Sequence, residues 1–348
     1  MRRSASEGPA RMRALAANLP RALEDGFRTG RELAPPAREG SSSVVVVGMG
    51  GSAIAADLAR GIISAESPVA YSVCRSPDLP RSVDRRTHVV LVSYSGNTWE
   101  TLQAYDAATR AGAHRTVVTS GGALAERATE DGVAVLPVPP GLPPRATVGQ
   151  LLGGMLGLLD PWFPESNEAR VARVAERVSG MVGTFARSRG PAAVLAERVG
   201  DRLPFVYAES AFLGLARRWK TQIEENAKRL AVFDEVPELF HNAIVGWDAT
   251  SRTEAARCAV LLLEWSGEGP LTRKSFRYLE SLLRRKSVRV QRVPLAAEDR
   301  LEALVAGISL GDYVSLFLAD RRGVDPLPVE AIGRLKATLG SPGPRGRN

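Results

Sequence analysis

Short runs of apolar, often β-branched residues alternate along the chain with longer segments whose apolar residues recur every three or four positions. The short runs are typical of buried strands, and the longer spacing is typical of helices that bury one face. In the first part of the chain the pattern predicts strands over 44–48, 68–74, 88–93, 115–119 and 133–138, and helices over 53–63, 98–111 and 122–129. Because apolar strands that alternate with helices are typical of parallel sheets covered on both faces, we predict a doubly wound sheet here.

The same alternation returns after a mostly helical stretch in the middle of the chain. That stretch predicts helices over 148–159 and 165–187. The pattern then predicts strands over 205–208, 243–247, 258–265 and 288–295, and helices over 210–230, 272–285, 298–318 and 329–339. The predicted fold class is therefore α/β, with two doubly wound parallel-sheet domains joined by helices.

Expected domain limits follow from the linkers. Residues 1–40 hold one predicted helix over 12–27 and a polar linker that contains two adjacent prolines. Polar segments rich in proline, serine and glycine are typical of linkers. We expect the first domain over 41–150, connecting helices over 151–200, the second domain over 201–340 and a disordered tail over 341–348.

The composition is that of a globular protein with a sizeable core. Of the 348 residues, 44% are hydrophobic and 24% are charged. The longest apolar runs, such as 44–47 and 259–263, are much shorter than the ~20 residues of a membrane-spanning helix. The first residues lack the continuous apolar segment of a secretory signal, so we expect a cytoplasmic protein with no membrane partner.

The net charge of +8 raises the question of a nucleic-acid partner. Only five of the 46 basic residues are lysine, and the arginines are spread evenly along the chain. The densest basic cluster, over 284–292, holds no aromatic residue. We therefore expect no nucleic-acid partner. Two distant cysteines and three dispersed histidines are too few for a disulfide framework or a metal centre, so we expect no metal.

A glycine-rich turn follows the first predicted strand. Gly48, Gly50 and Ala53 match the dinucleotide-binding spacing G-x-G-x-x-G/A between a strand and a helix. That motif expects an acidic residue about 20 positions later, whereas this chain has Cys74 and Arg75. An arginine could at best suit the 2′-phosphate of NADP. An NADP-dependent oxidoreductase and a tight turn without a ligand both remain alternatives.

A second turn, Ser93-Tyr94-Ser95-Gly96-Asn97-Thr98, follows the predicted strand 88–93 and precedes a helix. Its hydroxyls and backbone N–H groups can hold a phosphate at the helix N-terminus without a cation. Thr98 stands where a helix-capping side chain is expected. A capped polar turn without a ligand is the alternative interpretation. No Walker-type lysine accompanies the turn, which argues against nucleotide hydrolysis.

Together the two turns resemble the sugar isomerase (SIS) domain, whose serine- and threonine-containing turn holds a sugar phosphate. The rest of the chain is similar to the bifunctional phosphoglucose/phosphomannose isomerases, and the resemblance covers roughly residues 10–340. The matching segments are RWKTQIEENAK over 218–228, Pro237-Glu238, His241-Asn242, Pro143-Pro144-Arg145, Asp312-Tyr313-Val314-Ser315 and Asp325-Pro326.

The predicted helix over 210–230 supports the resemblance independently. Its apolar residues form one stripe that should face the core: Phe212, Ala216, Trp219, Ile223, Ala227 and Leu230. Glu225 lies on another face, where it is free to meet a ligand. The alternative is a surface carboxylate paired with Lys228 or Arg229 at helical spacing.

The resemblance implies a cofactor-independent, homodimeric isomerase of fructose 6-phosphate, glucose 6-phosphate and possibly mannose 6-phosphate, working through an enediolate in carbohydrate metabolism. By resemblance Glu225 is the base, Arg145 stabilises the enediolate, and His241 assists ring opening across the dimer interface. Lys336 is the candidate for a lysine near the ring oxygen. The expected substrate-binding residues are Gly50, Gly51, Ser52, Ser93, Ser95 and Thr98. The alternatives are a solvated helix lysine at 336 and a structural histidine before the predicted strand 243–247.

Two positions depart from the family pattern. Glu224 stands where the family usually has asparagine, and a second carboxylate there could raise the pKa of the base or point away from it. Leu327 stands in a region where the family often has the threonine tied to mannose 6-phosphate. These departures leave a non-catalytic sugar-phosphate-binding regulatory protein as the alternative function.

Overall fold

The computed structural model describes residues 7–34 and 43–339, so the predicted tail and most of the predicted proline-containing linker lie outside the described residues. The first half is built on five parallel strands in the order β2-β1-β3-β4-β5. The strands are β1 (Ser43–Gly48), β2 (Ala70–Cys74), β3 (Thr87–Val92), β4 (His114–Thr119) and β5 (Ala134–Pro137). The helices α3 (Gly50–Glu66), α4 (Trp99–Arg110) and α5 (Gly122–Glu130) connect them.

The order of these strands reverses direction at β1. The chain runs from β1 outward to β2 and then returns to β3 on the other side of β1. Ligands of doubly wound sheets bind at such a reversal, outside the carboxyl ends of the strands. Gly48, which ends β1, pairs in register with Val92, which ends β3. The two turns singled out by sequence therefore begin side by side.

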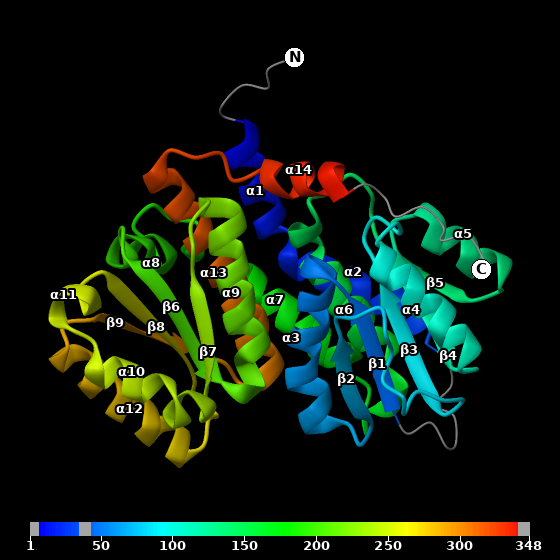
Figure 1. Cartoon of the computed structure of the whole chain (residues 1–348), viewed down its shortest axis with the longest axis horizontal. Coiled ribbons are helices and arrows are strands. Elements are labelled where there is room, and N and C mark those ends of the chain that lie inside the picture. Colours follow the sequence, from blue (N-terminus) through cyan, green and yellow to red (C-terminus); the bar gives the residue numbers. More distant parts are fainter. Residues whose placement is uncertain (1–6, 35–42, 340–348) are drawn as a thin grey trace.

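The second half repeats this plan with four parallel strands in the order β7-β6-β8-β9. They are β6 (Leu203–Glu209), β7 (Val232–Val236), β8 (Cys258–Trp265) and β9 (Arg289–Leu295). Its helices are α9 (Leu213–Ala227), α10 (Ala243–Ala249), α11 (Arg252–Ala255) and α12 (Pro270–Arg285). Figure 1 shows the two sheets side by side with α3 and α9 between them.

Close backbone contacts join the two halves along α3 and α9. A Cβ atom on Gly61 would lie 2.1 Å from the carbonyl oxygen of Ala211, and one on Gly214 would lie 2.6 Å from the Asp57 backbone. The buried Asp57 carboxylate also accepts from Arg217 at 2.9 Å. Residues of the two halves therefore meet at fixed positions.

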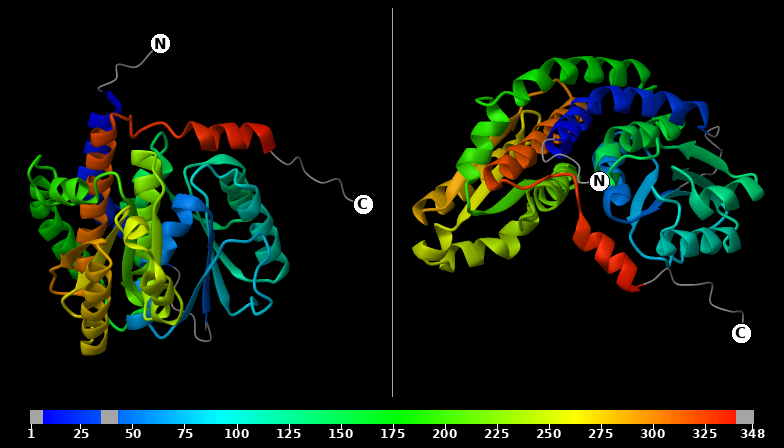
Figure 2. Two further views of the ribbon diagram at one scale, coloured as in Figure 1. Left: turned by 60° about the vertical axis from the view of Figure 1, so that its left-hand side comes forward. Right: turned by 90° about the horizontal axis from the view of Figure 1, so that it is seen from above.

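The remaining helices pack around this junction. They are α1 (Glu7–Ala17), α2 (Leu19–Glu32), α6 (Val148–Leu158), α7 (Glu168–Phe185), α8 (Pro191–Val199), α13 (Arg300–Arg322) and α14 (Glu330–Leu339), with the short 3₁₀ helices η1 (Pro144–Thr147), η2 (Asp160–Trp162), η3 (Ser210–Phe212) and η4 (Glu238–His241). By length and composition alone α13 could cross a membrane, but 94% of its apolar window is buried, as in a core helix. Helix α14 projects from the body of the molecule near the junction (Figure 2).

The helices α2 and α6 pack through glycine. A Cβ atom on Gly30 would lie 2.1 Å from the carbonyl oxygen of Gly154, and one on Gly153 would lie 1.9 Å from the carbonyl oxygen of Leu23. Only residues without a side chain permit such an approach of two helix backbones. The position of α6 is thereby tied to that of α2.

Three local predictions are wrong, and two elements are not predicted. The predicted helix over 12–27 is two helices, α1 and α2, because the chain turns at Asn18. The segment 243–247 is not a strand but the start of α10, and its helical start is fixed by the Asn242 side chain, which accepts from the Ala243 N–H. Strand β7 and helix α8 were not predicted. Leu230 does not complete the apolar stripe of α9, because it lies beyond the helix end and is 75% exposed.

Candidate active site

Arg145 is the buried cation of the site. It lies in η1, between β5 and α6, and its side chain is only 3% exposed. Its Nε donates to Asn226 Oδ1 at 2.8 Å, and its Nη2 donates to the carbonyl oxygens of Pro326 at 2.6 Å and Leu327 at 2.9 Å. Burial lowers the pKa of Arg145, and the nearby Glu225 carboxylate opposes that shift. The guanidinium is thus held on two of its nitrogens, and Nη1 is the nitrogen that faces Glu225.

Glu225 stands in the last turn of α9, opposite Arg145. Its Oε2 accepts from Arg145 Nη1 at 3.4 Å, and its side chain keeps 29% of its surface exposed. The prediction that this residue leaves the apolar face of the helix is correct, but in the described structure its carboxylate pairs with Arg145 rather than with Lys228 or Arg229. Lys228 donates to the main-chain oxygen of Glu225, and Arg229 donates to the carbonyl oxygens of Gly200 and Arg202.

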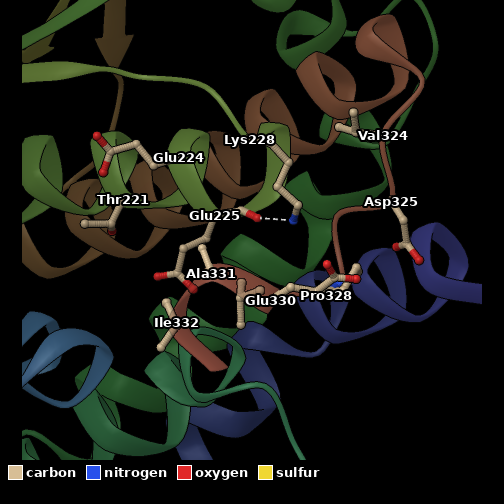
Figure 3. A pocket seen from close by; sticks show the side chains of 11 residues that line it. Thr221, Glu224, Glu225, Lys228, Val324, Asp325, Pro328, Glu330, Ala331 and Ile332 are labelled. Carbon is tan, nitrogen blue, oxygen red and sulfur yellow. Dashed lines mark hydrogen bonds between the residues drawn. The ribbon is translucent and has the colours of Figure 1, made fainter. Parts of the chain in front are cut away.

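Glu225 borders a cleft of about 680 Å³. The cleft lies between α9, the segment that leads from α13 to α14, and the first turn of α14 (Figure 3). Its lining residues are Thr221, Glu224, Glu225, Lys228, Val324, Asp325, Pro328, Val329, Glu330, Ala331 and Ile332. The carboxylate of Glu225 points toward Ala331 and Ile332 in this view. A half-exposed carboxylate beside a buried guanidinium can exchange a proton with a ligand that enters the cleft.

The second carboxylate of the motif points elsewhere. Glu224 forms an ion pair with Lys220, one helical turn earlier, at 2.7 Å. Figure 3 shows its carboxylate directed away from that of Glu225. The replacement of the usual asparagine by Glu224 therefore adds a charge that Lys220 balances, and the structure places that charge on a different side of the cleft from the candidate base.

A network of buried polar side chains positions the Arg145–Glu225 pair. Asn226, which accepts from Arg145, donates from Nδ2 to Ser315 Oγ at 2.9 Å. One turn earlier, Gln222 donates to Asp312 Oδ1 at 2.8 Å. Two turns earlier, Arg218 binds both oxygens of the same Asp312 at 2.8 and 2.7 Å. The spacing of Arg218, Gln222 and Asn226 by four is the sequence signal of this network, and the structure shows that the polar face they form is buried.

Lys228 is a second cation of the cleft that the sequence did not single out. Its backbone adopts the left-handed conformation, with φ of 54°. Its Nζ donates to the carbonyl oxygen of Pro326 at 3.2 Å, so this one oxygen accepts from both Lys228 and Arg145. Burial lowers the pKa of Lys228, and the charge of Arg145 adds to that effect. The two cations together fix the segment that forms one wall of the cleft.

The two expected phosphate-binding turns lie beside the loop that carries Arg145. A Cβ atom on Gly51 would lie 3.4 Å from the backbone of Pro144, the residue before Arg145. The Tyr94 hydroxyl donates to the Pro139 carbonyl oxygen at 3.0 Å and accepts from the Leu142 N–H at 2.8 Å. Both turns therefore contact the 139–145 loop, although none of their residues is among those that line the cleft next to Glu225.

Within the serine turn, the hydroxyls interact locally. Ser93 Oγ donates to Thr98 Oγ1 at 2.8 Å, and Ser95 Oγ accepts from the Asn97 N–H at 3.3 Å. Thr98 occupies the position before α4 as predicted, but its side chain does not cap the helix. The hydroxyls of Ser52 and Ser93 belong to buried residues, next to the N-termini of α3 and α4. Such N-termini favour an anion.

His241 lies apart from the Arg145–Glu225 pair, at the other end of β7. His241 ends η4 and is exposed, and it precedes α10 rather than a strand. Since α9 ends just before β7 and η4 follows β7, His241 and Glu225 stand at opposite ends of β7. Lys336 lies on α14, and its side chain lies outside the described part of the structure.

The structure also bears on the nucleotide and metal alternatives. Arg75, which could have met a 2′-phosphate, is paired with the buried Asp57 carboxylate and donates to the carbonyl oxygen of Ala53 at 3.5 Å. That engagement leaves it less suited to a cofactor phosphate. Within residues 7–34 and 43–339, no group of three or more His, Cys, Asp and Glu side chains is placed to hold a metal ion.

The chain is similar to known proteins in both sequence and fold. Residues 188–339 match the model of the bacterial phospho-glucose isomerase C-terminal SIS domain. The chain is 33% identical over 332 residues to the bifunctional phosphoglucose/phosphomannose isomerase of Caldicellulosiruptor bescii, covering 92% of this chain and 97% of that protein. It is 33% identical over 303 residues to the Aquifex aeolicus protein of the same name, covering 85% of this chain and 90% of that protein. The crystal structure of tagatose-6-phosphate ketose/aldose isomerase from Escherichia coli has the same fold, with a TM-score of 0.68 at 18% identity over 91% of this chain and 94% of that one.

Proposed function

The chain belongs to the bifunctional phosphoglucose/phosphomannose isomerase family, and from that premise we propose that it interconverts fructose 6-phosphate with glucose 6-phosphate and with mannose 6-phosphate. The relatives favour an aldose–ketose isomerase over a non-catalytic sugar-phosphate-binding protein. The single observation on which the site assignment rests is the contact between Arg145 and Glu225, 3.4 Å apart at the edge of the cleft. This contact brings the proposed base, Glu225 of the second half, next to the cation Arg145 of the first half.

The chemistry needs a base and a positive charge. In the proposed reaction Glu225 removes a proton from the carbon next to the carbonyl group and returns it to the neighbouring carbon. The negative charge that develops on the enediolate oxygen is stabilised by Arg145. Because Nε and Nη2 of Arg145 are occupied by protein oxygens, Nη1 is the nitrogen that faces the substrate.

We assign the phosphate to the two turns at the carboxyl edge of the first sheet. In this assignment Gly50, Gly51 and Ser52 supply the N-terminus of α3, and the hydroxyls of Ser93, Ser95 and Thr98 supply donors at the N-terminus of α4. Their contacts with the 139–145 loop support this, because they put the phosphate site next to Arg145. The sugar then extends from these turns toward Glu225.

Ring opening requires a further group, which we assign to His241 of a second copy of the chain. The strand β7, which separates the two residues in one chain, has 5 residues and spans ~16 Å. His241 therefore does not serve the Glu225 of its own chain. Its exposure makes it available to a partner, so we propose a homodimer. We assign Lys336 to the ring oxygen, because α14 carries it and the first turn of α14 lines the cleft.

Position 327 bears on the use of mannose 6-phosphate. Leu327 replaces the threonine of the family, and its side chain packs against the core, while its carbonyl oxygen accepts from Arg145. The residue thus contributes its backbone rather than a hydroxyl. We further propose that the enzyme works in the cytoplasm, since phosphorylated sugars carry charges that membranes exclude.

The decisive experiment compares two neighbouring carboxylates. The purified chain is assayed with each hexose 6-phosphate, together with the variants Glu225→Gln and Glu224→Gln. We expect Glu225→Gln to lower kcat on the order of 10²–10⁴-fold, and Glu224→Gln to stay within a few-fold of the wild type. Absence of turnover with all three sugars refutes the isomerase function. Near-normal turnover by Glu225→Gln removes that residue from the role of base.

A further inference from the structure

A groove of about 830 Å³ lies at the amino edge of the second sheet, away from the cleft next to Glu225. Five arginines from five segments of the chain line it: Arg198 of α8, Arg202 before β6, Arg257 before β8, Arg289 at the start of β9 and Arg321 near the end of α13. Figure 1 shows α8 and β6 next to each other in this part of the second half. The volume lies within the range of pockets that bind small molecules.

The lining of this groove carries an excess of positive charge. Two carboxylates, Glu197 and Asp201, line it together with the five guanidinium groups, and no ion pair joins any of these seven side chains in the described structure. Elsewhere arginines are matched closely, as where Arg170 meets both Glu66 and Asp299. Like charges gathered around one concave surface raise the free energy of the folded state. An anion bound in the groove would remove that penalty.

The groove is also held in shape by neutral acceptors. Arg198 donates to Gln291 Oε1 at 2.6 Å, and Arg202 donates to the carbonyl oxygen of Ala256 at 3.1 Å. Arg229, which is not among the lining residues, donates to the carbonyl oxygens of Gly200 and Arg202. These contacts position two of the lining arginines and the loop before β6 without neutralising their charge.

We propose that this groove binds a small anion that carries two or three linked phosphate groups. Guanidinium groups present paired N–H donors that match the oxygens of phosphate, and several phosphates are needed to meet arginines spread around a groove of this size. The side chains of Arg257, Arg289 and Arg321 make no hydrogen bond or ion pair within the described residues, so their donors are available to such a ligand.

The groove is separate from the catalytic cleft, although the two are neighbours along the chain. Lys228 lines the cleft, and the next residue, Arg229, supports the loop of the groove. A polyphosphate in the groove would therefore leave the cleft open to the sugar phosphate. Binding here is independent of the proposed isomerase function.

The test uses inorganic tripolyphosphate as the probe and titration calorimetry on the full chain. A saturating concentration of fructose 6-phosphate occupies the phosphate-binding turns throughout. The variant Arg257→Gln/Arg289→Gln/Arg321→Gln removes the three free guanidinium groups. The matched control Arg81→Gln/Arg85→Gln/Arg110→Gln removes three arginines from the surface of the first half, two of which line a smaller groove there.

We expect one saturable site, with affinity lowered at least about tenfold in the groove variant and within about twofold in the control. If the triple variant fails to fold, the single variant Arg289→Gln replaces it, because Arg289 is exposed. This variant should also weaken the binding of tripolyphosphate. Absence of saturable binding overturns the proposal, as does an equal loss in the control. Saturable binding that is seen only when fructose 6-phosphate is left out also overturns it, because that result would place the anion in the catalytic site.

Discussion

Replacement of Asn226 by alanine tests whether the buried network positions the guanidinium of Arg145. The change removes the acceptor of Arg145 Nε and the donor to Ser315 Oγ, while Ser315 keeps its own bond to the carbonyl oxygen of Asp312 at 2.6 Å. A hydrogen bond to a charged group contributes about 1.5–3 kcal/mol and a neutral one about 1 kcal/mol. We therefore expect the free energy of unfolding to fall by about 2.5–4 kcal/mol.

The same change should reduce turnover more than substrate binding. Once Nε is released, Arg145 keeps its Nη2 hydrogen bonds to the main chain and its 3.4 Å contact with Glu225, which fix the plane of the guanidinium less tightly. Loss of a positioned charge next to the reacting atoms predicts a fall in kcat of roughly 10–100-fold, with a smaller change in KM. The assay couples formation of glucose 6-phosphate from fructose 6-phosphate to NADP reduction, and urea denaturation measures stability in parallel.

The matched control is Gln222→Ala, one turn earlier on the same buried face. It removes one hydrogen bond to Asp312, whose two oxygens stay bound to Arg218, and it does not touch Arg145. We expect a comparable loss of stability of about 1.5–3 kcal/mol with kcat nearly unchanged. Asn226→Asp, which keeps an acceptor for Arg145, should recover part of the lost kcat. The reasoning is refuted if Asn226→Ala keeps normal turnover, or if Gln222→Ala loses as much.

Two further predictions address the partner chain and the pH dependence of stability. Mixing the inactive variants Glu225→Gln and His241→Ala should restore about a quarter of wild-type activity. Half of the randomly formed dimers are mixed, and each mixed dimer has one intact site of its two. No recovery after subunit exchange would mean that His241 does not act across the interface. Burial, reinforced by the neighbouring Glu264, raises the pKa of Glu268 to about 7. The folded chain therefore keeps this proton over a pH range in which the unfolded chain has lost it, and stability falls as the pH rises from about 4.5 to about 7. Glu268→Gln should remove up to about 3 kcal/mol of that fall in urea denaturation at pH 5 and pH 8, and identical pH slopes for variant and wild type would contradict the assignment.

The fold class was predictable because the central strands are apolar throughout. Runs such as 44–47 in β1 and 259–263 in β8 can be buried only in a sheet covered on both faces. The edge strand β7 was missed because its sequence VFDEV carries two acids and is mostly half-buried or exposed. The segment 243–247 was assigned to the wrong element because a short apolar run fits a strand and a buried helix equally well. The domain limits stay a prediction.

The identities of the main site residues could be predicted from the sequence, but the contacts between them could not. Resemblance to the family indicated Glu225 and Arg145, and the structure brings these two into contact. Nothing in the spacing of the chain could show that Asn226 accepts from Arg145, 81 positions away, or that Pro326 gives one oxygen to two cations. Such contacts depend on how helices from the two halves meet. The roles of His241 and Lys336 rest on resemblance and stay predictions.

The glycine contacts between α2 and α6 have a consequence for Arg145, although they lie outside the cleft. Helix α6 begins with Val148, three positions after Arg145, and its backbone touches that of α2 with no side chain between them. A methyl group at Gly153 would meet the carbonyl oxygen of Leu23 and force the two helices apart. Because η1 leads directly into α6, a displacement of α6 would also move the guanidinium of Arg145. Variation in the amino-terminal helices is therefore constrained by the position of Arg145 as well as by stability, and variants there should lose turnover before they lose the fold.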